Sequence, residues 1–300
     1  DGTHDSPKQT EFGKYLITSK HIKDNRIDFE SAYKISEDDY NKIITRSKVD
    51  QWDIIISMIG AYCGFCCIES SKQTDYAIKN VGLLKVGNEL KCKWLYYYLT
   101  SPHGKQQLSK LRSGSSQPYI SLGALRNLDI PVPNENTMSD IVSVLSSLDS
   151  KIELNRRIND NLEQQAQALF KAWFVDNAVI GDASVSDYFI PLRGKNLLTS
   201  DAKGGEVPVV AGGLTPSAYH NVANTKAPVI TISASGANAG YVNLWGIPVW
   251  SADSSYIDSS ITPHIYFWYN LLKFSQKNIF DSQTGSAQPH IYPKHIGDIR

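Results

Sequence analysis

The sequence predicts an α+β fold in which two similar modules flank one long helix. Short β-branched strands are mixed with few helices, a polar Gly-Ser-x-Gln-Pro segment occurs twice, and a long stretch between the two copies lacks helix breakers. Hydrophobic residues make up 41% of the 300 residues and charged residues 20%, which is typical of a chain with a packed core.

An internal repeat is the clearest organising feature of the chain. The segment Ser113–Ile120 recurs as Thr284–Ile291, displaced by 171 residues. Two further anchors recur in the same order at nearly the same displacement: Ile54–Gly64 with Ile230–Gly240, and Trp94–Leu99 with Phe267–Leu272. Small changes in the displacement indicate loop insertions, so we expect two copies of one module.

Each copy is expected to contain the same elements in the same order. An apolar strand (Ile54–Ser57, Val229–Ser233) leads into a glycine-containing turn, and an aromatic helix follows at about residues 93–111 and 263–280. The polar loop and a short apolar segment complete the copy. We therefore expect three parts: a first module over 1–136, a helical spacer over 137–176 and a second module over 177–300.

The stretch from Thr137 to Phe174 predicts one long helix, with Ser139 as its N-cap. A seam with alternating spacing of four and three residues runs along it, as in a coiled coil. We expect contacts with another helix at Ile141, Leu145, Leu148, Ile152, Asn155, Asn159, Leu162, Leu169 and Trp173. Either the helix lies on its own modules, or it pairs with another long helix from a second copy, another subunit or this chain.

The ends of the chain suggest that the natural protein is longer. The sequence opens with Asp1 instead of Met, and Arg300 matches the place where the first copy continues into Ile130-Pro-Val-Pro133 and the helix. We expect a second, similar helix to follow, running antiparallel to the first.

Charge, cysteine content and hydropathy limit the class of protein. Lys plus Arg and Asp plus Glu both number 30, so the chain alone should bind DNA weakly at physiological salt. The four cysteines, all in the first third, indicate reduced and partly buried thiols better than a zinc site or a disulfide scaffold. The sequence shows no signal peptide or spanning apolar run, and we expect a cytoplasmic protein.

The segments Ile130–Asn155 and Leu162–Phe174 are similar to the central region of the specificity subunits of type I restriction–modification enzymes. Gly2–Pro7 and the loops at 113–118 and 284–289 resemble the target recognition domains of that family. The resemblance covers essentially the whole chain, and the central helix is its most specific part.

This resemblance implies a DNA-recognition and scaffolding subunit with no catalysis of its own. Each module would recognise one half of a bipartite double-stranded DNA target, and the helix would set the gap between the halves. The partners implied are methyltransferase subunits and restriction–translocation subunits. S-adenosylmethionine, ATP and Mg²⁺ would be bound by those partners, and no cofactor or metal is expected in this chain.

Residues that contact DNA need amide, hydroxyl or cationic side chains, because these can form hydrogen bonds with base edges or phosphates. In the first module the candidates are Lys20, His21, Lys23, Asn25, Lys79, Asn80, Ser115, Ser116 and Gln117. In the second module they are Thr215, Ser217, His220, Asn221, Ser235, Asn238, Ser254, Ser286, Gln288 and His290. Each of them is also an ordinary residue type for a solvated loop. Tyr96–Tyr98 and Trp268-Tyr269 are expected in the core instead of stacking on bases.

The alternative is an enzyme. Asp75 with Glu89-Leu-Lys91 fits loosely the acidic residue and Glu-x-Lys of an Mg²⁺-dependent nuclease, although the segment is also typical of a strand and its turn. A specificity part fused to catalysis in missing segments is a further alternative. No P-loop and no Gly-x-Ser-x-Gly elbow occurs in the sequence.

Overall fold

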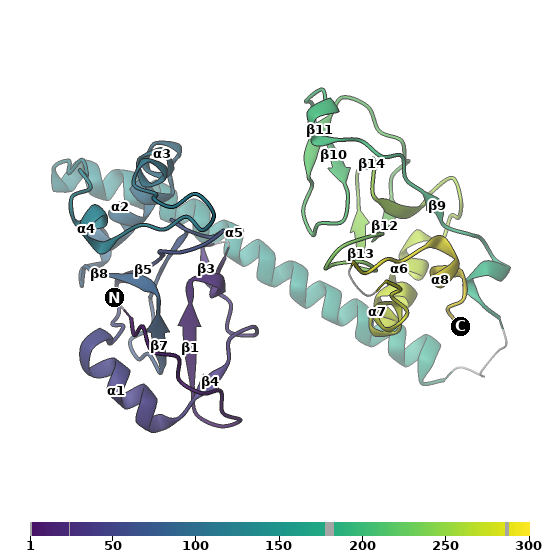
Figure 1. Cartoon of the computed structure of the whole chain (residues 1–300). Helices are drawn as coiled ribbons and strands as arrows, with labels where there is room; N and C mark the ends of the chain where they lie inside the picture. The colour runs from purple at the N-terminus through teal and green to yellow at the C-terminus, as the bar shows by residue number, and fades with distance from the viewer. Residues whose placement is uncertain (1, 24, 178–182, 286–287) are drawn as a thin grey trace. The chain divides into compact units, whose positions relative to one another are not determined.

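The computed structural model describes residues 2–23, 25–177, 183–285 and 288–300, which form two compact units (Figure 1). Unit 1 spans Asp1–Asn155 and unit 2 spans Arg156–Arg300. Both units combine helices with small β-sheets, so the predicted α+β class is confirmed.

Unit 1 is built from eight short strands, several helices and the first part of a long helix. The elements are β1 (Lys14–Thr18), η1 (Ser19–His21), β2 (Ile22–Lys23), β3 (Arg26–Ile27), β4 (Lys34–Ile35), α1 (Glu37–Ser47), β5 (Asp53–Ser57), β6 (Cys66–Ile68), β7 (Tyr76–Lys79), β8 (Val81–Lys85), α2 (Glu89–Thr100), α3 (Pro102–Lys110), α4 (Leu122–Arg126) and α5 (Glu135–Phe170).

Unit 2 contains the rest of α5 and repeats much of this order. Its further elements are η2 (Lys171–Val175), η3 (Val185–Asp187), β9 (Leu192–Arg193), η4 (Thr199–Asp201), β10 (Val207–Val210), β11 (Ala218–His220), β12 (Val229–Ser233), β13 (Val242–Trp245), β14 (Trp250–Ser251), β15 (Ser254–Asp258), α6 (Ile265–Phe274), α7 (Gln276–Asp281) and α8 (Pro293–Gly297).

The internal repeat is confirmed by the sheets at the centre of each unit. Strand β5 pairs antiparallel with β6 and β8, and β12 pairs antiparallel with β13 and β15. The registers agree as well: Ile55 lies opposite Cys67 and Leu83, while Thr231 lies opposite Asn243 and Tyr256. Every residue of β5 and β12 is buried, which is why both strands are apolar runs without alternation.

A second sheet repeats in the same way. Strand β1 lies between β4, which is antiparallel to it, and β7, which is parallel. Strand β10 lies between β11 and β14 in the same two orientations. Each sheet of unit 1 therefore has a counterpart of the same strand order in unit 2, where β9 adds a fourth strand beside β15, although the sequences of the front halves show little likeness.

The aromatic helix of each copy is interrupted, where the sequence predicted one continuous helix. In unit 1 the break falls at Ser101-Pro102, because Pro102 has no N–H to continue α2 and the Ser101 hydroxyl accepts from Gly104 N at 3.0 Å to start α3. In unit 2 the break falls at Ser275, and the turn places Ile279 of α7 against Gly240.

Helix α5 is the long helix that the sequence predicts, and its 36 residues give a length of about 54 Å at 1.5 Å per residue. The predicted N-cap was wrong. The helix begins at Glu135, where the Asn134 Oδ1 accepts from Thr137 N at 2.9 Å, so Ser139 already lies inside the helix. Beyond Phe170 the backbone becomes π-helical in η2.

Within each unit, α5 is held by the aromatic helix. The Tyr97 hydroxyl on α2 donates to Asp149 Oδ2 at 2.8 Å, and the Tyr269 hydroxyl on α6 donates to Glu163 Oε1 at 2.7 Å. Tyr96 and Trp268 are buried in the two cores, as the sequence predicted. In both units, a tyrosine of the aromatic helix thus binds a carboxylate of α5.

Candidate nucleic-acid interface

The turn that follows each central strand has the same hydrogen bonds in both units. Gly60 N donates to Pro118 O at 2.8 Å in unit 1, and Gly236 N donates to Pro289 O at 3.0 Å in unit 2. These bonds attach the turn after β5 or β12 to the Gln-Pro end of the polar loop. Two segments that are distant in sequence therefore form one loop cluster in each unit.

The polar loop itself is closed by paired backbone bonds. Ser113 exchanges two bonds with Tyr119, both at 2.8 Å, and Thr284 exchanges bonds of 3.0 and 2.8 Å with His290. In unit 1 the tip of the loop, Ser115–Gln117, is exposed. This closure fixes the loop's direction, so its polar side chains can be presented to a partner.

In unit 1 the cluster brings together three of the predicted residues. Lys20, Asn80 and Gln117 line one open depression with Tyr62 and the turn at Gly60. Asn80 holds a positive φ of 55°, a conformation that asparagine tolerates better than most residues. An ammonium and two amides on one surface match the groups that bind phosphates and adenine edges. Tyr62 was not predicted, because nothing in the sequence distinguishes it from a core tyrosine.

The other six predicted residues of unit 1 do not line this depression: His21, Lys23, Asn25, Lys79, Ser115 and Ser116. Lys79 Nζ donates to Ser6 Oγ, and Lys23 forms an ion pair with Asp28 at 2.9 Å. Asn25, with a φ of 63°, lines a different pocket beside α3.

In unit 2 the equivalent position is organised around an acidic residue. Asp253, which occupies the place of Asn80, accepts from Ser235 Oγ and forms an ion pair with Arg193 at 2.7 Å. Asn238 Nδ2 donates to Gly212 O at 3.4 Å. The structure therefore brings Ser235 and Asn238 together. It adds Arg193, which no sequence pattern singled out.

The remaining candidates of unit 2 are spread over its loops. Exposed side chains occur at Thr215, Ser217, Asn221 and Gln288. His290 is half-buried and stacks against Tyr292, with ring centroids 6.1 Å apart. Ser286 lies outside the described residues.

Burial removes three predicted contact residues from the candidate set. His21, His220 and Ser254 are 0, 5 and 0% exposed. His21 Nδ1 accepts from Thr18 N at 3.0 Å, His220 Nδ1 accepts from Lys203 N at 3.1 Å, and Ser254 Oγ donates to Val210 O at 3.2 Å. Burial also lowers the pKa of His21, which disfavours a charged contact. One polar atom of each residue thus bonds to the local backbone, which residue type alone did not indicate, whereas the buried His21 Nε2 has no hydrogen-bond partner among the described residues.

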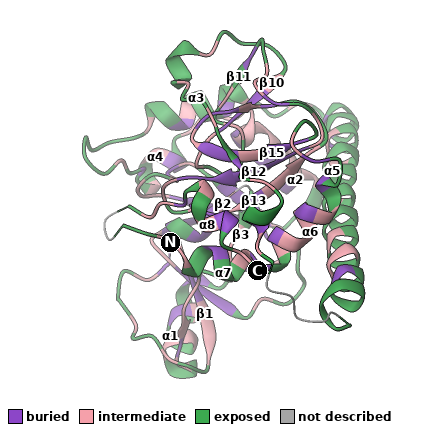
Figure 2. Cartoon of the chain, turned by 90° about the vertical axis from the view of Figure 1, so that its right-hand side faces the viewer, coloured by how far each residue is buried: buried purple, intermediate pink, exposed green. Residues whose placement is uncertain are grey.

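Most of the predicted seam of α5 is exposed, and Figure 2 shows the helix largely in the colour of exposed residues. The buried side chains of α5 are Met138 and Val142 in unit 1 and Phe170 in unit 2. The seam residue Leu145 is half-buried, and the others are exposed: Ile141, Leu148, Ile152, Asn155, Asn159, Leu162, Leu169 and, in η2, Trp173. The helix thus docks on its own units with one face and leaves a second apolar face open.

The structure does not assemble the nuclease motif. Glu89 and Lys91 lie in the first turn of α2, not in a strand and turn, and residues two apart on a helix do not share a face. Glu89 forms an ion pair with Lys93 at 2.6 Å, and Asp75 forms one with Lys14 at 3.3 Å. Among the described residues, no group of three or more His, Cys, Asp or Glu side chains is placed to hold a metal ion.

The predicted state of the cysteines is confirmed, since Cys63, Cys66, Cys67 and Cys92 are all free and buried. Burial raises the pKa of each of these thiols. Across the described ranges, no helix has the length and apolar character needed to span a bilayer.

Comparison with known proteins identifies the family. The family described as "Type I restriction modification DNA specificity domain" matches residues 5–164, which is more than half of the chain. The chain therefore belongs to this family. The predicted resemblance to type I specificity subunits is confirmed by the family and by the names of its relatives.

Two of these relatives and one solved structure illustrate the match. The chain is 35% identical over 124 residues to the type I restriction enzyme HindI specificity subunit of Haemophilus influenzae, which covers 40% of this chain and 27% of that protein. It is 28% identical over 116 residues to the MjaIX specificity subunit of Methanocaldococcus jannaschii, covering 39% and 24%. The crystal structure of the S subunit of a type I system from M. genitalium matches with a TM-score of 0.49 and 20% identity over 97% of this chain and 77% of that one.

The chain spans less than two thirds of the length of the curated relatives it matches.

Proposed function

We propose that this chain recognises a bipartite DNA target, with the module at 1–136 contacting one half and the module at 177–300 the other. The observation that carries the proposal is the repeated loop cluster. Both units build the same turn and polar loop from the same backbone hydrogen bonds, yet they present different side chains on them. A shared scaffold with different contact groups is what recognition of two different half-targets requires.

The chemistry of the clusters supports this assignment. In unit 1, Lys20, Asn80 and Gln117 offer donors suited to phosphate oxygens. The two amides also offer the pair of groups that the adenine edge needs, an N–H that donates to N7 and an oxygen that accepts from the N6 amino group. In unit 2, Asp253 offers an acceptor suited to the amino group of cytosine, and Arg193 offers a guanidinium. The zero net charge implies that partner surfaces contribute phosphate contacts as well.

In this proposal, the segment 137–176 is the spacer and the partner-binding element. The exposed seam from Ile141 to Trp173 is an apolar surface of the kind that pairs with another helix. Methyltransferase and restriction–translocation subunits would assemble on the chain, and S-adenosylmethionine, ATP and Mg²⁺ would be bound by them.

The test is methylation mapping of genomic DNA from cells that make this chain with its methyltransferase subunit. The variant N80A/Q117A should relax one half of the methylated motif, and D253N, which places the asparagine of unit 1 in unit 2, should relax the other half. Each good bidentate contact contributes about 1–3 kcal/mol of discrimination, so the relaxed positions should admit other bases at rates raised about five- to a hundredfold. The control is Q106A, an exposed glutamine on α3 that lines none of this depression.

The outcomes separate the alternatives. Loss of specificity in a different half for each variant, with Q106A unchanged, supports two recognition modules. A motif that keeps both halves in all variants would remove these clusters from DNA recognition.

A further inference from the structure

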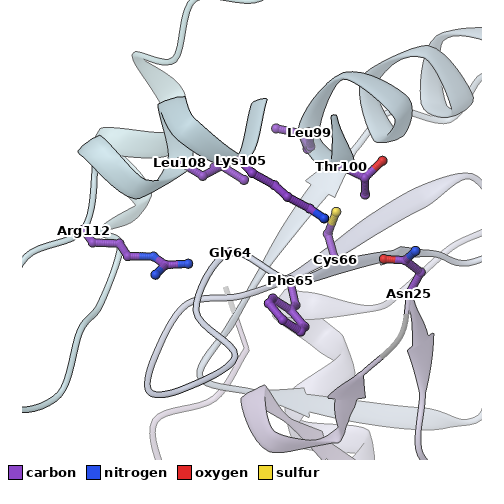
Figure 3. Close-up of a pocket in the computed structure, with 9 residues that line it drawn as sticks. All are labelled: Asn25, Gly64, Phe65, Cys66, Leu99, Thr100, Lys105, Leu108 and Arg112. Carbon is purple, nitrogen blue, oxygen red and sulfur yellow. The ribbon is translucent and has the colours of Figure 1, made fainter. Parts of the chain in front are cut away.

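A pocket of about 320 Å³ lies beside the loop cluster of unit 1, between the turn at Gly64 and helices α2 and α3 (Figure 3). Phe65 forms one wall, and Lys105 and Arg112 extend toward it from α3 and from just beyond its end. The Thr100 hydroxyl and the Asn25 amide complete the polar lining. None of the proposed base contacts of unit 1 except Asn25 belongs to this pocket.

The polar lining of the pocket carries positive charge. Lys105 and Arg112 both line it, and none of the described residues that line it is acidic. Arg112 Nη2 donates to Cys63 O at 2.5 Å, which leaves further guanidinium donors. The Lys105 ammonium forms no hydrogen bond or ion pair with any residue in the described part of the chain. Two cations at one pocket, with no carboxylate among the described residues that line it, favour an anionic ligand.

Unit 2 shows what the same scaffold looks like without such a site. Gln283 occupies the place of Arg112, and its Nε2 donates to Ala239 O at 2.7 Å, the bond that Arg112 makes to Cys63. Gln276 occupies the place of Lys105.

The Gln276 side chain forms hydrogen bonds with the backbone of the turn and strand that it packs against. Its Nε2 donates to Gly240 O at 2.8 Å, and its Oε1 accepts from Val242 N at 3.0 Å. A lysine has three donors and no acceptor, so Lys105 cannot make the second of these bonds. In unit 2 a neutral amide at this position is sufficient for the fold. The positive charge of Lys105 in unit 1 is therefore not required for folding.

The aromatic residue at this position is also more accessible in unit 1 than in unit 2. In unit 2 the ring of Tyr241 is covered by Lys273, whose Nζ lies 4.6 Å from the ring centroid. In unit 1 the equivalent ring is Phe65, and the short Thr100 stands in the place of Lys273. Phe65 contacts the ring of Tyr62 edge to face, with centroids 5.6 Å apart, and remains 42% exposed, so part of its ring surface is accessible to a ligand.

We propose that this pocket binds a nucleotide unit, with its phosphate held by Lys105 and Arg112 and its base against the ring of Phe65. Thr100 and Asn25 supply hydrogen bonds to the sugar or the base edge. The nucleotide is either a free mononucleotide or a nucleotide of the DNA strand at the neighbouring loop cluster. Only the second source rests on the proposed function.

The test compares the full chain with the variant K105Q/R112Q. Both substitutions copy the residues of unit 2, so the glutamine that replaces Arg112 can keep the bond to Cys63 O. The single variant K105Q removes an ammonium that forms no hydrogen bond or ion pair with the described residues. The matched control K110Q removes the same charge from an exposed position of α3 that does not line this pocket. The probes are AMP, adenosine and a random-sequence DNA duplex, and binding is measured by isothermal titration calorimetry and, for the duplex, as a function of salt.

If a free nucleotide is the ligand, the wild-type chain binds AMP more tightly than adenosine. The double variant then loses about tenfold or more in AMP affinity, because charge-assisted hydrogen bonds to the phosphate are removed. K105Q should lose part of this affinity, and K110Q should stay within about twofold of wild type.

If a nucleotide of the DNA strand is the ligand, the double variant should make the salt dependence of duplex binding less steep. The magnitude of the slope of log affinity against log salt should fall by about 1, as expected for one lost phosphate contact. The control K110Q should leave this slope unchanged. A change in AMP affinity or in the salt slope supports the site and identifies the source. Equal AMP affinity and equal salt slope in wild type and double variant would overturn it. AMP binding does not depend on recognition of a DNA sequence. The proposed two-module function is tested separately by the methylation map, so the two proposals can fail independently.

Discussion

Replacing Gly240 with alanine should destabilise unit 2 far more than replacing Gly64 destabilises unit 1. The two glycines are equivalent in the repeat, and their φ values, +90° and +91°, are nearly the same. A Cβ at Gly240 would lie 2.8 Å from Ile279 Cγ2 and 3.2 Å from Ile291 Cγ1. At Gly64 the nearest atom would be Arg112 Nη2 at 3.5 Å, an ordinary contact.

The size of each effect follows from these contacts. The left-handed backbone costs an alanine about 1–2 kcal/mol in either unit. The crowding at Gly240 adds about 1–3 kcal/mol, because Ile279 and Ile291 are fully packed core residues that must shift. We therefore expect a loss in unfolding free energy of about 1–2 kcal/mol for G64A and about 2–5 kcal/mol for G240A.

Amide hydrogen exchange resolved by peptide is the suitable assay, since a chain of two units need not unfold in one step. Peptides containing β5 report on unit 1, and peptides containing β12 report on unit 2. Equal losses in the two units would refute the argument, because the backbone strain is the same and only the packing differs. A loss of only about 1–2 kcal/mol for G240A, which is the backbone cost alone, would show that the core around Ile279 and Ile291 yields without cost, against the expected range for overpacking.

Three further predictions concern the long helix, an acidic group and the thiols. Y269F removes the donor to Glu163 Oε1 and should cost unit 2 about 0.5–1.5 kcal/mol in the same exchange assay, whereas an unchanged value would mean that this bond to α5 contributes nothing. Hydrogen bonds from Ser31, and then from Lys23, hold the pKa of Asp28 at about 2, below its usual 3.8; their stabilisation is present above about pH 4 and lost as the pH falls toward 2. S31A should raise the pKa of Asp28 toward 3.8 in a carboxyl NMR titration, and an unshifted midpoint would exclude Ser31 as the main cause. Burial raises the pKa of Cys66 to about 12, so at about pH 8 the native chain should resist thiol reagents and react only in denaturant. Rapid labelling of Cys66 in the native chain, followed by mass spectrometry, would contradict this protection.

The sequence determined the repeat, the central strands and the long helix. These features rest on local patterns: a repeated Gly-Ser-x-Gln-Pro loop, buried apolar runs at 54–57 and 229–233, and a helical stretch of 36 residues without a breaker. The hydrophobic effect acts on such patterns wherever they occur, so their outcome can be predicted from spacing alone.

Only the tertiary structure decided which polar side chains are available. His21, His220 and Ser254 are residue types that also occur in exposed loops, but one polar atom of each bonds to a nearby backbone atom and the surrounding structure buries the side chain. Such contacts cannot be predicted from the spacing of polar and apolar residues. The break of the aromatic helix at Ser275 likewise depends on how α7 packs, not on a proline.

The pairing of Lys105 with Arg112 shows the same division. The repeat aligns them with Gln276 and Gln283, so the sequence contained the difference between the copies. What the sequence could not show is that both positions face one pocket and that the glutamines are satisfied by backbone atoms while the cations are left facing it. Whether a charged side chain can bind a ligand depends on the groups around it, and those groups come together only in the folded chain.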